Sequence, residues 1–178
     1  METKIFNGKQ IQIRQLSKKD LGNVKKFQDF INSLINEDTQ ILMNKRFSLR
    51  EEREWMKDKL KKIKNRQSIF LVAKDGEKVV GTTGIDLLMG RQNHVGNFGI
   101  TIRKGYQGIG LGNYLTSEII KLAKKELKPK IIRLNVFPTN KPAINLYKKY
   151  GFKKVASIPK QINYKGKLLD EITMILYL

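Results

Sequence analysis

A glycine-rich segment constrains the fold of this chain more than any other feature: Gln107-Gly108-Ile109-Gly110-Leu111-Gly112 joins an extended run to an apolar-periodic one. Glycines at alternating positions remove side chains where a helix is expected to begin. The first N–H groups of a helix are unpaired and lie at the positive end of its dipole. The segment therefore predicts a strand, a loop and a helix that together bind an anion, with phosphate as the typical ligand.

The spacing of the glycines excludes two nucleotide-binding motifs. No Gly-Lys-Ser/Thr follows them, as a P-loop requires. Counting from Gly108, a dinucleotide-binding fingerprint needs a glycine at position 113, where Asn113 stands. The loop alone leaves two interpretations open, an anion site of another kind or a flexible turn without a ligand.

Length and composition indicate one globular domain spanning residues 1–178. A chain of 178 residues can bury a sizeable core, and no repeat, low-complexity linker or composition boundary interrupts it. The chain has no cysteine and one histidine, His94, which excludes thiolate chemistry and argues against a metal site. It has no membrane-length apolar run and no apolar run after the N-terminal charges, so we expect a cytoplasmic protein without a signal peptide.

The net charge of +20, from 36 Lys and Arg against 16 Asp and Glu, has two interpretations. Such a field attracts nucleic acid, acidic membranes or a phosphorylated cofactor. Because the lysines are spread along the chain, they also fit a solvated surface. The most basic helical surface is expected around residues 57–64, and it lacks the interleaved aromatic residues that stack on bases.

Hydrophobic periodicity predicts a mixed α/β domain with the order β-α-α-β-β-β-α-β-α-β-β. Ser17 with Asp20, and Ser48 with Glu51, are spaced as capping boxes that start the first two helices. The second helix is expected to end near residue 65, and the third follows the glycine loop. The expected strands are residues 10–14, 68–74, 78–88, 94–103, 130–137, 152–158 and 169–178, and the last helix is 140–150.

A second motif lies in residues 140–152, which read N-x-x-A-x-x-L-Y-x-x-x-G-F. Asn140 is suited to cap a helix, and Pro142 is tolerated in its first turn. Ala143 and Tyr147 share one helical face, and Gly151 is suited to end the helix. By itself, the motif also fits a helix without a ligand, in which Tyr147 is a core aromatic residue and Asn140 an ordinary helix cap.

Together the two motifs resemble the GNAT superfamily of acetyl-CoA-dependent N-acetyltransferases. The family signature Q/R-x-x-G-x-G/A is matched by Gln107, Gly110 and Gly112, and its second signature by residues 140–152. The element order extends the resemblance over nearly the whole chain. It implies a mostly antiparallel mixed sheet, flanked by helices and splayed between its fourth and fifth strands, residues 94–103 and 130–137.

The resemblance also implies where acetyl-CoA binds as co-substrate. The backbone around Gly108, Gly110 and Gly112 is expected to bind the diphosphate, and Asn140 to hydrogen-bond the pantetheine. Tyr147 is expected to point its hydroxyl at the sulfur and protonate the leaving thiolate. The full expected cofactor set is Ile100, Thr101, Ile102, Gln107, Gly108, Ile109, Gly110, Leu111, Gly112, Asn113, Asn140 and Tyr147.

The general base is the least determined part of the predicted site. Many family members carry a strand carboxylate at the position of Asn97, which can orient a water but cannot accept a proton. His94 is a candidate base or an ordinary strand-end histidine. Other candidates on neighbouring strand ends are Asp86, Asp170 and Glu171, for each of which we favour an ordinary surface carboxylate. A water chain to bulk solvent would serve as well, and we favour it.

The acceptor is expected to be a primary amine on a small molecule, an amino acid or a protein N-terminus, attacking directly in a ternary complex. Glu37, Asp38 and Tyr164 lie in segments that line the acceptor site in this family, although solvated acids would look the same. Two alternatives stay open, an RNA- or ribosome-associated module and a non-catalytic acyl-CoA sensor. A monomer and a homodimer are both compatible with the sequence.

Overall fold

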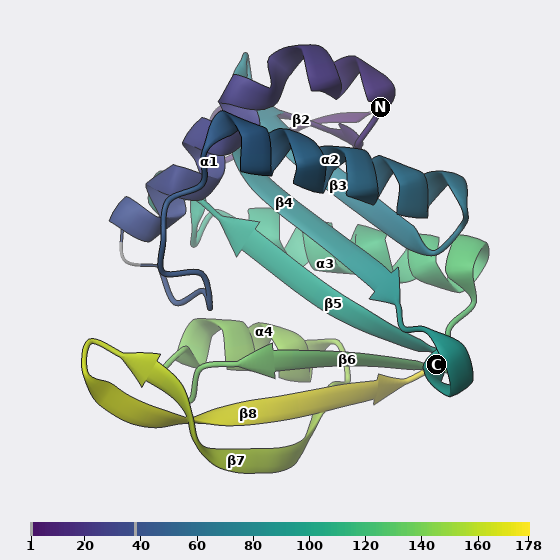
Figure 1. The fold of residues 1–178 in the computed structure, drawn as a ribbon, viewed down its shortest axis with the longest axis vertical. Coiled ribbons are helices and arrows are strands. Elements are labelled where there is room, and N and C mark those ends of the chain that lie inside the picture. Colours follow the sequence, from purple (N-terminus) through teal and green to yellow (C-terminus); the bar gives the residue numbers. More distant parts are fainter. Residues whose placement is uncertain (1, 38) are drawn as a thin grey trace.

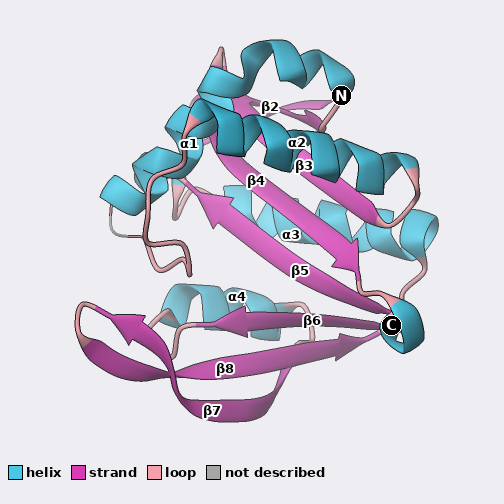
Figure 2. Cartoon of the chain, viewed as in Figure 1, coloured by secondary structure: helices cyan, strands magenta, loops and turns pink. Residues whose placement is uncertain are grey.

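The computed structural model describes residues 2–37 and 39–178. An eight-stranded sheet, in the order β1-β2-β3-β4-β5-β6-β8-β7, carries helices on both faces (Figures 1 and 2). All neighbouring strands run antiparallel except β5 and β6. The strands are β1 (Glu2–Phe6), β2 (Lys9–Gln15), β3 (Ser68–Asp75), β4 (Lys78–Leu87), β5 (Val95–Ile102), β6 (Ile131–Val136), β7 (Lys153–Tyr164) and β8 (Lys167–Tyr177). The α-helices are α1 (Val24–Asn36), α2 (Leu49–Lys64), α3 (Leu111–Leu122) and α4 (Lys141–Lys149). Short 3-10 helices form η1 (Lys18–Asn23), η2 (Gly90–Gln92) and η3 (Lys104–Tyr106), and η4 (Ala123–Leu127) is a π-helical extension of α3.

This architecture confirms the predicted fold class and adds one strand. β1 was not predicted, because its residues are mostly exposed and show no apolar alternation. Its signal is the turn instead: Asn7 and Gly8 both have positive φ, +48° and +77°, as a two-residue hairpin requires. The predicted fourth and fifth strands are therefore β5 and β6.

Two predicted elements differ from the structure at their ends. The helix expected after Ser17 begins as the 3-10 turn η1, and α-helical geometry starts at Val24. The strand predicted to end at residue 158 continues as β7 to Tyr164. A register shift between Ile158 and Ile162 interrupts its pairing with β8. Such irregularities break the residue alternation from which strand length is predicted.

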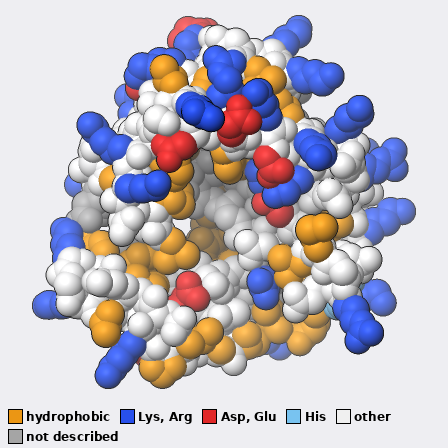
Figure 3. Space-filling model, viewed as in Figure 1, with side chains coloured by type: hydrophobic (Ala, Val, Ile, Leu, Met, Phe, Trp, Pro, Cys, Tyr) orange, Lys and Arg blue, Asp and Glu red, His pale blue; other side chains and the backbone are white. Residues whose placement is uncertain are grey.

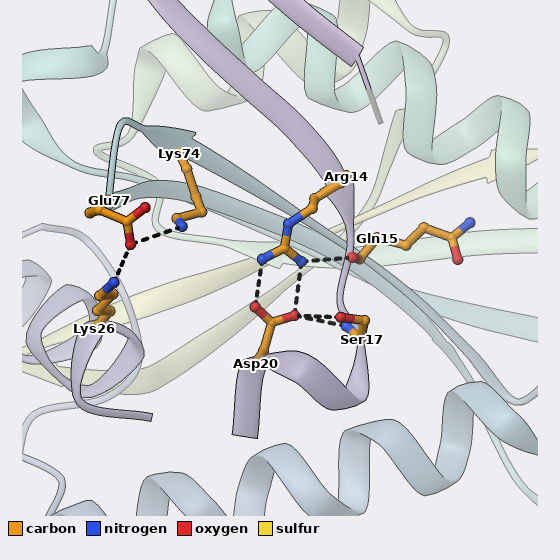
Figure 4. A network of polar contacts seen from close by, with 7 residues as sticks. All are labelled: Arg14, Gln15, Ser17, Asp20, Lys26, Lys74 and Glu77. Atoms are coloured by element: carbon orange, nitrogen blue, oxygen red, sulfur yellow. Dashed lines mark hydrogen bonds and ion pairs between the residues drawn. The ribbon is translucent and has the colours of Figure 1, made fainter. Parts of the chain in front are cut away.

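A buried ion pair fixes the start of the helical layer to the sheet (Figure 4). Arg14 of β2 donates to both carboxylate oxygens of Asp20, at 2.8 and 2.5 Å, and the Ser17 N–H donates to the same carboxylate at 2.8 Å. Burial alone would raise the pKa of Asp20. The hydrogen bonds from Arg14 and Ser17 outweigh it and hold that pKa below its usual value.

Two hydrophobic cores lie on opposite faces of the sheet. α1 and α2 cover one face of the N-terminal half, and α3 lies behind it (Figure 1). Strand β3 contributes to both cores, because Phe70 and Val72 face α1 and α2 while Ile69 and Leu71 face the other way. α4 packs its Ile144 and Tyr147 into the α3 core. The second half of the sheet, β6 to β7, is thus attached to the first half mainly through one face.

Charged side chains are distributed around the periphery of the molecule. Lys and Arg project from the rim of the face in Figure 3, and the hollow at its centre is bordered by hydrophobic and acidic side chains together with some basic ones. In the part of the chain that the structure describes, no helix has the length and hydrophobicity needed to cross a bilayer.

Candidate active site

The sheet opens between β5 and β6. Only three residue pairs join these parallel strands, Val95 with Ile131, Gly96 with Ile132 and Asn97 with Arg133. On its other side, β5 pairs with β4 from Gly96 to Ile102. Beyond Asn97, the backbone edge of β5 that faces β6 is therefore unpaired. The splay expected between the fourth and fifth predicted strands is confirmed.

A cavity of about 1190 Å³ occupies this opening and continues onto the face covered by α1 and α2. Its lining comes from segments far apart in the sequence, and its mouth is the hollow in Figure 3. One end is formed by β5, the glycine loop and α4. The other end is formed by α1, the segment after it, α2, and the same-face residues Thr82, Gly84 and Asp86 of β4.

The glycine loop adopts the backbone that its composition predicts. Gly108 and Gly110 have φ of +75° and +92°, in the left-handed region that favours glycine, and Gly110 is the N-cap residue of α3. The Gln107 side chain donates to the carbonyl of Ile102 at 2.8 Å and ties the loop to the end of β5. A Cβ on Gly112 would lie 3.3 Å from Ile102 Cδ1. The loop thus brings bare backbone and a helix N-terminus to the cavity.

Most of the predicted cofactor residues line this one end. The lining set is Ile100, Thr101, Ile102, Gln107, Gly108, Gly110, Gly112, Asn113, Asn140 and Tyr147. The two others, Ile109 and Leu111, belong to the α3 core, where Leu111 is fully buried. Their side chains pack inward, so only their backbone groups are placed to face a ligand.

α4 brings Asn140 and Tyr147 to the wall opposite β5. The Asn140 side-chain oxygen accepts from the Ala143 N–H at 3.2 Å, so this residue is the helix N-cap as expected. Tyr147 is 7% exposed, and its ring meets Phe98 and Phe152 at centroid distances of 5.8 and 6.0 Å. Burial raises the pKa of Tyr147 to about 12. Its phenol is therefore a firmly protonated donor at the edge of the cavity.

The candidate bases are placed differently from one another. His94 is exposed and does not line the cavity; its carbonyl accepts from the N–H groups of Lys130 and Ile131 at 2.8 and 3.3 Å. Asn97 does line the cavity, at the point where β5 and β6 separate. Asp86, which pairs with Asn97 from the neighbouring strand β4, also lines the cavity.

The carboxylates predicted as alternatives are already engaged by other groups. Lys59 donates to both oxygens of Asp86, at 2.7 and 2.6 Å. Glu171 lines the cavity and accepts from Asn135 at 3.0 Å. Asp170 lies outside the lining and accepts from the Lys160 N–H at 3.2 Å.

Of the two predicted acceptor residues that the structure describes, Glu37 lies in the cavity wall and Tyr164 does not. Glu37 accepts from the Lys104 N–H at 2.9 Å and pairs with Arg103 at 3.4 Å, so it anchors the loop after β5. Tyr164 packs edge-on against Phe137, with ring centroids 5.7 Å apart. Asp38 lies outside the described residues.

Sequence reasoning missed a buried acid on α2. Glu52 lines the cavity and is 6% exposed, and burial raises its pKa to about 7. Among the described residues, no hydrogen bond or ion pair to its carboxylate is found. The available signal was helical spacing: Glu52 and Lys59 are placed at i and i+7 on the same face as Met56. Polar residues within an apolar stripe indicate a buried polar function.

The chain belongs to the GNAT acetyltransferase family, whose family model matches residues 32–152. The predicted resemblance is thereby confirmed. An L-amino acid N-acetyltransferase of Escherichia coli, AaaT, is 36% identical over 101 residues, which are 56% of this chain and 62% of that protein. The chain thus spans less than two thirds of the length of that relative.

Solved structures show the same fold. A GNAT-family acetyltransferase from Streptococcus pneumoniae superposes with a TM-score of 0.83 at 24% identity, covering 94% of this chain and 99% of that one. A Salmonella typhimurium protein, yncA, was solved with its cofactor acetyl-CoA; its TM-score is 0.79 at 19% identity, with 94% of each chain covered. In residues 2–37 and 39–178, no group of three or more His, Cys, Asp or Glu side chains is placed to bind a metal ion.

Proposed function

We propose that the protein is an acetyl-CoA-dependent N-acetyltransferase that transfers the acetyl group directly to a primary amine in a ternary complex. The observation that carries this proposal is the opening between β5 and β6. It connects a bare-backbone anion loop on one side to a cavity bordered by acidic and aromatic residues on the other. The end of the cavity at the glycine loop suits a phosphorylated donor, and the end at α1 and α2 suits an amine acceptor.

The residues at the first end fit acetyl-CoA. The N–H groups in the first turn of α3 have no intrahelical partners and lie at its positive end, so they suit a diphosphate. Gly112 leaves room where a Cβ would lie 3.3 Å from Ile102. The unpaired edge of β5 beyond Asn97 offers N–H and C=O groups to an extended chain that carries amides, in the manner of an added strand.

In this proposal, the protein positions the two substrates, stabilises the charge that develops on the thioester carbonyl and the sulfur, and removes a proton from the amine. Acetyl-CoA supplies a thioester carbonyl, which a neutral amine attacks. Backbone N–H groups of β5 near Ile100 stabilise negative charge on the carbonyl oxygen. The Tyr147 phenol donates a hydrogen bond to the departing sulfur. Asn97 orients the water that carries away the proton of the amine.

Binding and turnover test this proposal separately. Calorimetric titration with acetyl-CoA should give a dissociation constant within the usual range for enzyme substrates, about 1 μM to 1 mM. Absence of binding at millimolar acetyl-CoA refutes it. Release of free CoA thiol with a panel of amines then measures turnover. Binding without turnover on any amine favours the acyl-CoA sensor, for which Asn97 in place of a carboxylate is the supporting observation.

The nucleic-acid alternative rests on the charge of +20. Filter binding of RNA at increasing salt tests it, because each phosphate contact adds to the slope of affinity against salt. Strong, salt-sensitive RNA binding together with acetyl transfer would indicate an acceptor amine carried on a ribosome or an aminoacyl-tRNA.

A further inference from the structure

Glu52 differs from the other acids that line the cavity. The remaining described carboxylates in the lining, Glu37, Asp86 and Glu171, each accept a hydrogen bond from a protein donor. Glu52 has no such partner among the described residues, although it is 6% exposed. A buried carboxylate without a partner is costly to ionise, and burial accordingly raises its pKa to about 7. Within the described residues, Glu52 thus has neither a cation nor a hydrogen-bond donor as partner.

The buried cation of the same helix does not pair with Glu52. Lys59 lies two turns after Glu52 on α2, and its ammonium donates to both oxygens of Asp86. It also lies 5.7 and 5.4 Å from the ring centroids of Trp55 and Phe70. These rings already make cation–π contacts with one ammonium group, so the aromatic residues at this end of the cavity suit a cation.

The walls around Glu52 are mostly apolar, although the Lys59–Asp86 pair and Thr82 also line this end of the cavity. The residues of α1, α2, β3 and the segment after α1 that line this end are mostly aromatic or aliphatic: Phe27, Phe30, Ile41, Phe47, Trp55 and Phe70. Such walls desolvate a ligand and favour apolar groups by burial of their surface. A carboxylate without a protein partner, in a mostly apolar end of the cavity, matches a molecule with one cationic head and an apolar body.

We propose that Glu52 binds the ammonium group of the acceptor, and that the acceptor is a primary amine with an apolar body. The proposal rests on the proposed function, because it assigns this end of the cavity to the acceptor. Binding an ammonium group gives the Glu52 carboxylate the partner that the protein does not provide. Glu52 is thus a specificity-determining residue, and its ion pair forms only when the acceptor is present.

Amine binding to the full chain tests the role of Glu52 without requiring turnover. Calorimetry follows 2-phenylethylamine, and ethanolamine as a polar comparison, binding to protein saturated with CoA. The variants are Glu52→Gln and the control Glu54→Gln, which removes the same charge from an exposed position on the same helix. Titration with acetyl-CoA and the KM for amine are measured in parallel.

We expect Glu52→Gln to weaken 2-phenylethylamine binding about 10- to 100-fold, the usual effect of losing a hydrogen bond to a charged group. Its acetyl-CoA affinity should stay within about twofold of wild type, as should both affinities of Glu54→Gln. Equal amine affinity in the two variants overturns the role of Glu52. Failure of wild type to bind 2-phenylethylamine, or tighter binding of ethanolamine, overturns the apolar-amine assignment. Failure to bind acetyl-CoA would instead refute the proposed function.

Discussion

The Tyr147→Phe substitution removes one oxygen atom from the wall of the active site and leaves the ring in place. The ring is held by edge-on contact with Phe98, at a centroid distance of 5.8 Å, and by contact with Phe152. No described residue hydrogen-bonds the hydroxyl, whose pKa burial raises to about 12. Removing an unpartnered buried hydroxyl should change the free energy of unfolding by less than about 1 kcal/mol.

The magnitude of the catalytic effect follows from that pKa. A thiol has a pKa of about 8.5, so complete proton transfer from a phenol of pKa about 12 to the departing thiolate is uphill. Tyr147 is therefore expected to donate a hydrogen bond to the thiolate and keep its proton, rather than protonate the thiolate as the family resemblance implied. A hydrogen bond to a charged group contributes about 1.5–3 kcal/mol. Its loss should lower kcat about 10- to 150-fold.

Thiol release at saturating acetyl-CoA measures kcat, and calorimetry measures acetyl-CoA affinity. The affinity should stay within about twofold, because the hydrogen bond strengthens only as charge develops on sulfur. Tyr177→Phe, an exposed position on β8, is the control for loss of a phenol elsewhere. The wild-type pH–rate profile should show no loss of activity from Tyr147 ionisation below about pH 11.

Two results would refute this reasoning. Unchanged kcat in Tyr147→Phe would assign the tyrosine to core packing alone. A large loss of stability would show that the hydroxyl has a structural partner, and urea unfolding detects that directly.

Three further predictions concern the glycine loop, the end of the cavity formed by α1 and α2, and Glu52. Gly110→Ala and Gly166→Ala both place a side chain at positive φ, +92° and +78°, so each should lower the free energy of unfolding by about 1 kcal/mol. Only Gly110→Ala should also weaken acetyl-CoA binding, by about tenfold in calorimetry. Gly84→Ala places a Cβ 2.6 Å from Phe70 Cδ2 and should destabilise by about 1–3 kcal/mol in urea unfolding, with a raised KM for amine as the ring shifts. Glu52→Gln should stabilise the protein at pH 8 by up to about 3 kcal/mol, because the folded state favours the protonated form of Glu52. Wild-type stability should therefore fall as the pH rises from about 4.5 to about 7. Thermal unfolding should show that the gain in the variant vanishes near about pH 4. Equal acetyl-CoA affinity in the two turn-glycine variants, unchanged stability in Gly84→Ala, or a pH-independent effect at Glu52 would each contradict the corresponding argument.

The parts of the site that the sequence predicts are those set by short-range backbone rules. Glycines at 108 and 110 adopt positive φ, and Asn140 caps α4, because each needs only its immediate neighbours. Ser48 forms the predicted capping box with Glu51 for the same reason. The same local rules applied to Asn7 and Gly8 would have predicted β1.

The acceptor side was less predictable, because pairing and burial there depend on distant segments. Glu37 looked like an acid available for an amine, but Lys104 and Arg103, more than sixty residues away, already engage it. His94 looked like a candidate base, but it lies exposed in the turn before β5 and outside the cavity lining. No local pattern distinguishes a solvated acid from one that a remote segment binds.

The sequence by itself determined the family, the order of the elements and the anion-binding loop, since capping, turn geometry and hydrophobic periodicity act over a few residues. The tertiary structure alone decided where β5 and β6 separate and which acid is left without a partner. Asn97 ends the β5–β6 ladder because the two strands diverge there. Glu52 acquires a pKa of about 7 because folding buries it in the wall of a cavity shared with β3, β4 and β5. Desolvation depends on everything that surrounds a group, and those surroundings exist only once the chain has folded.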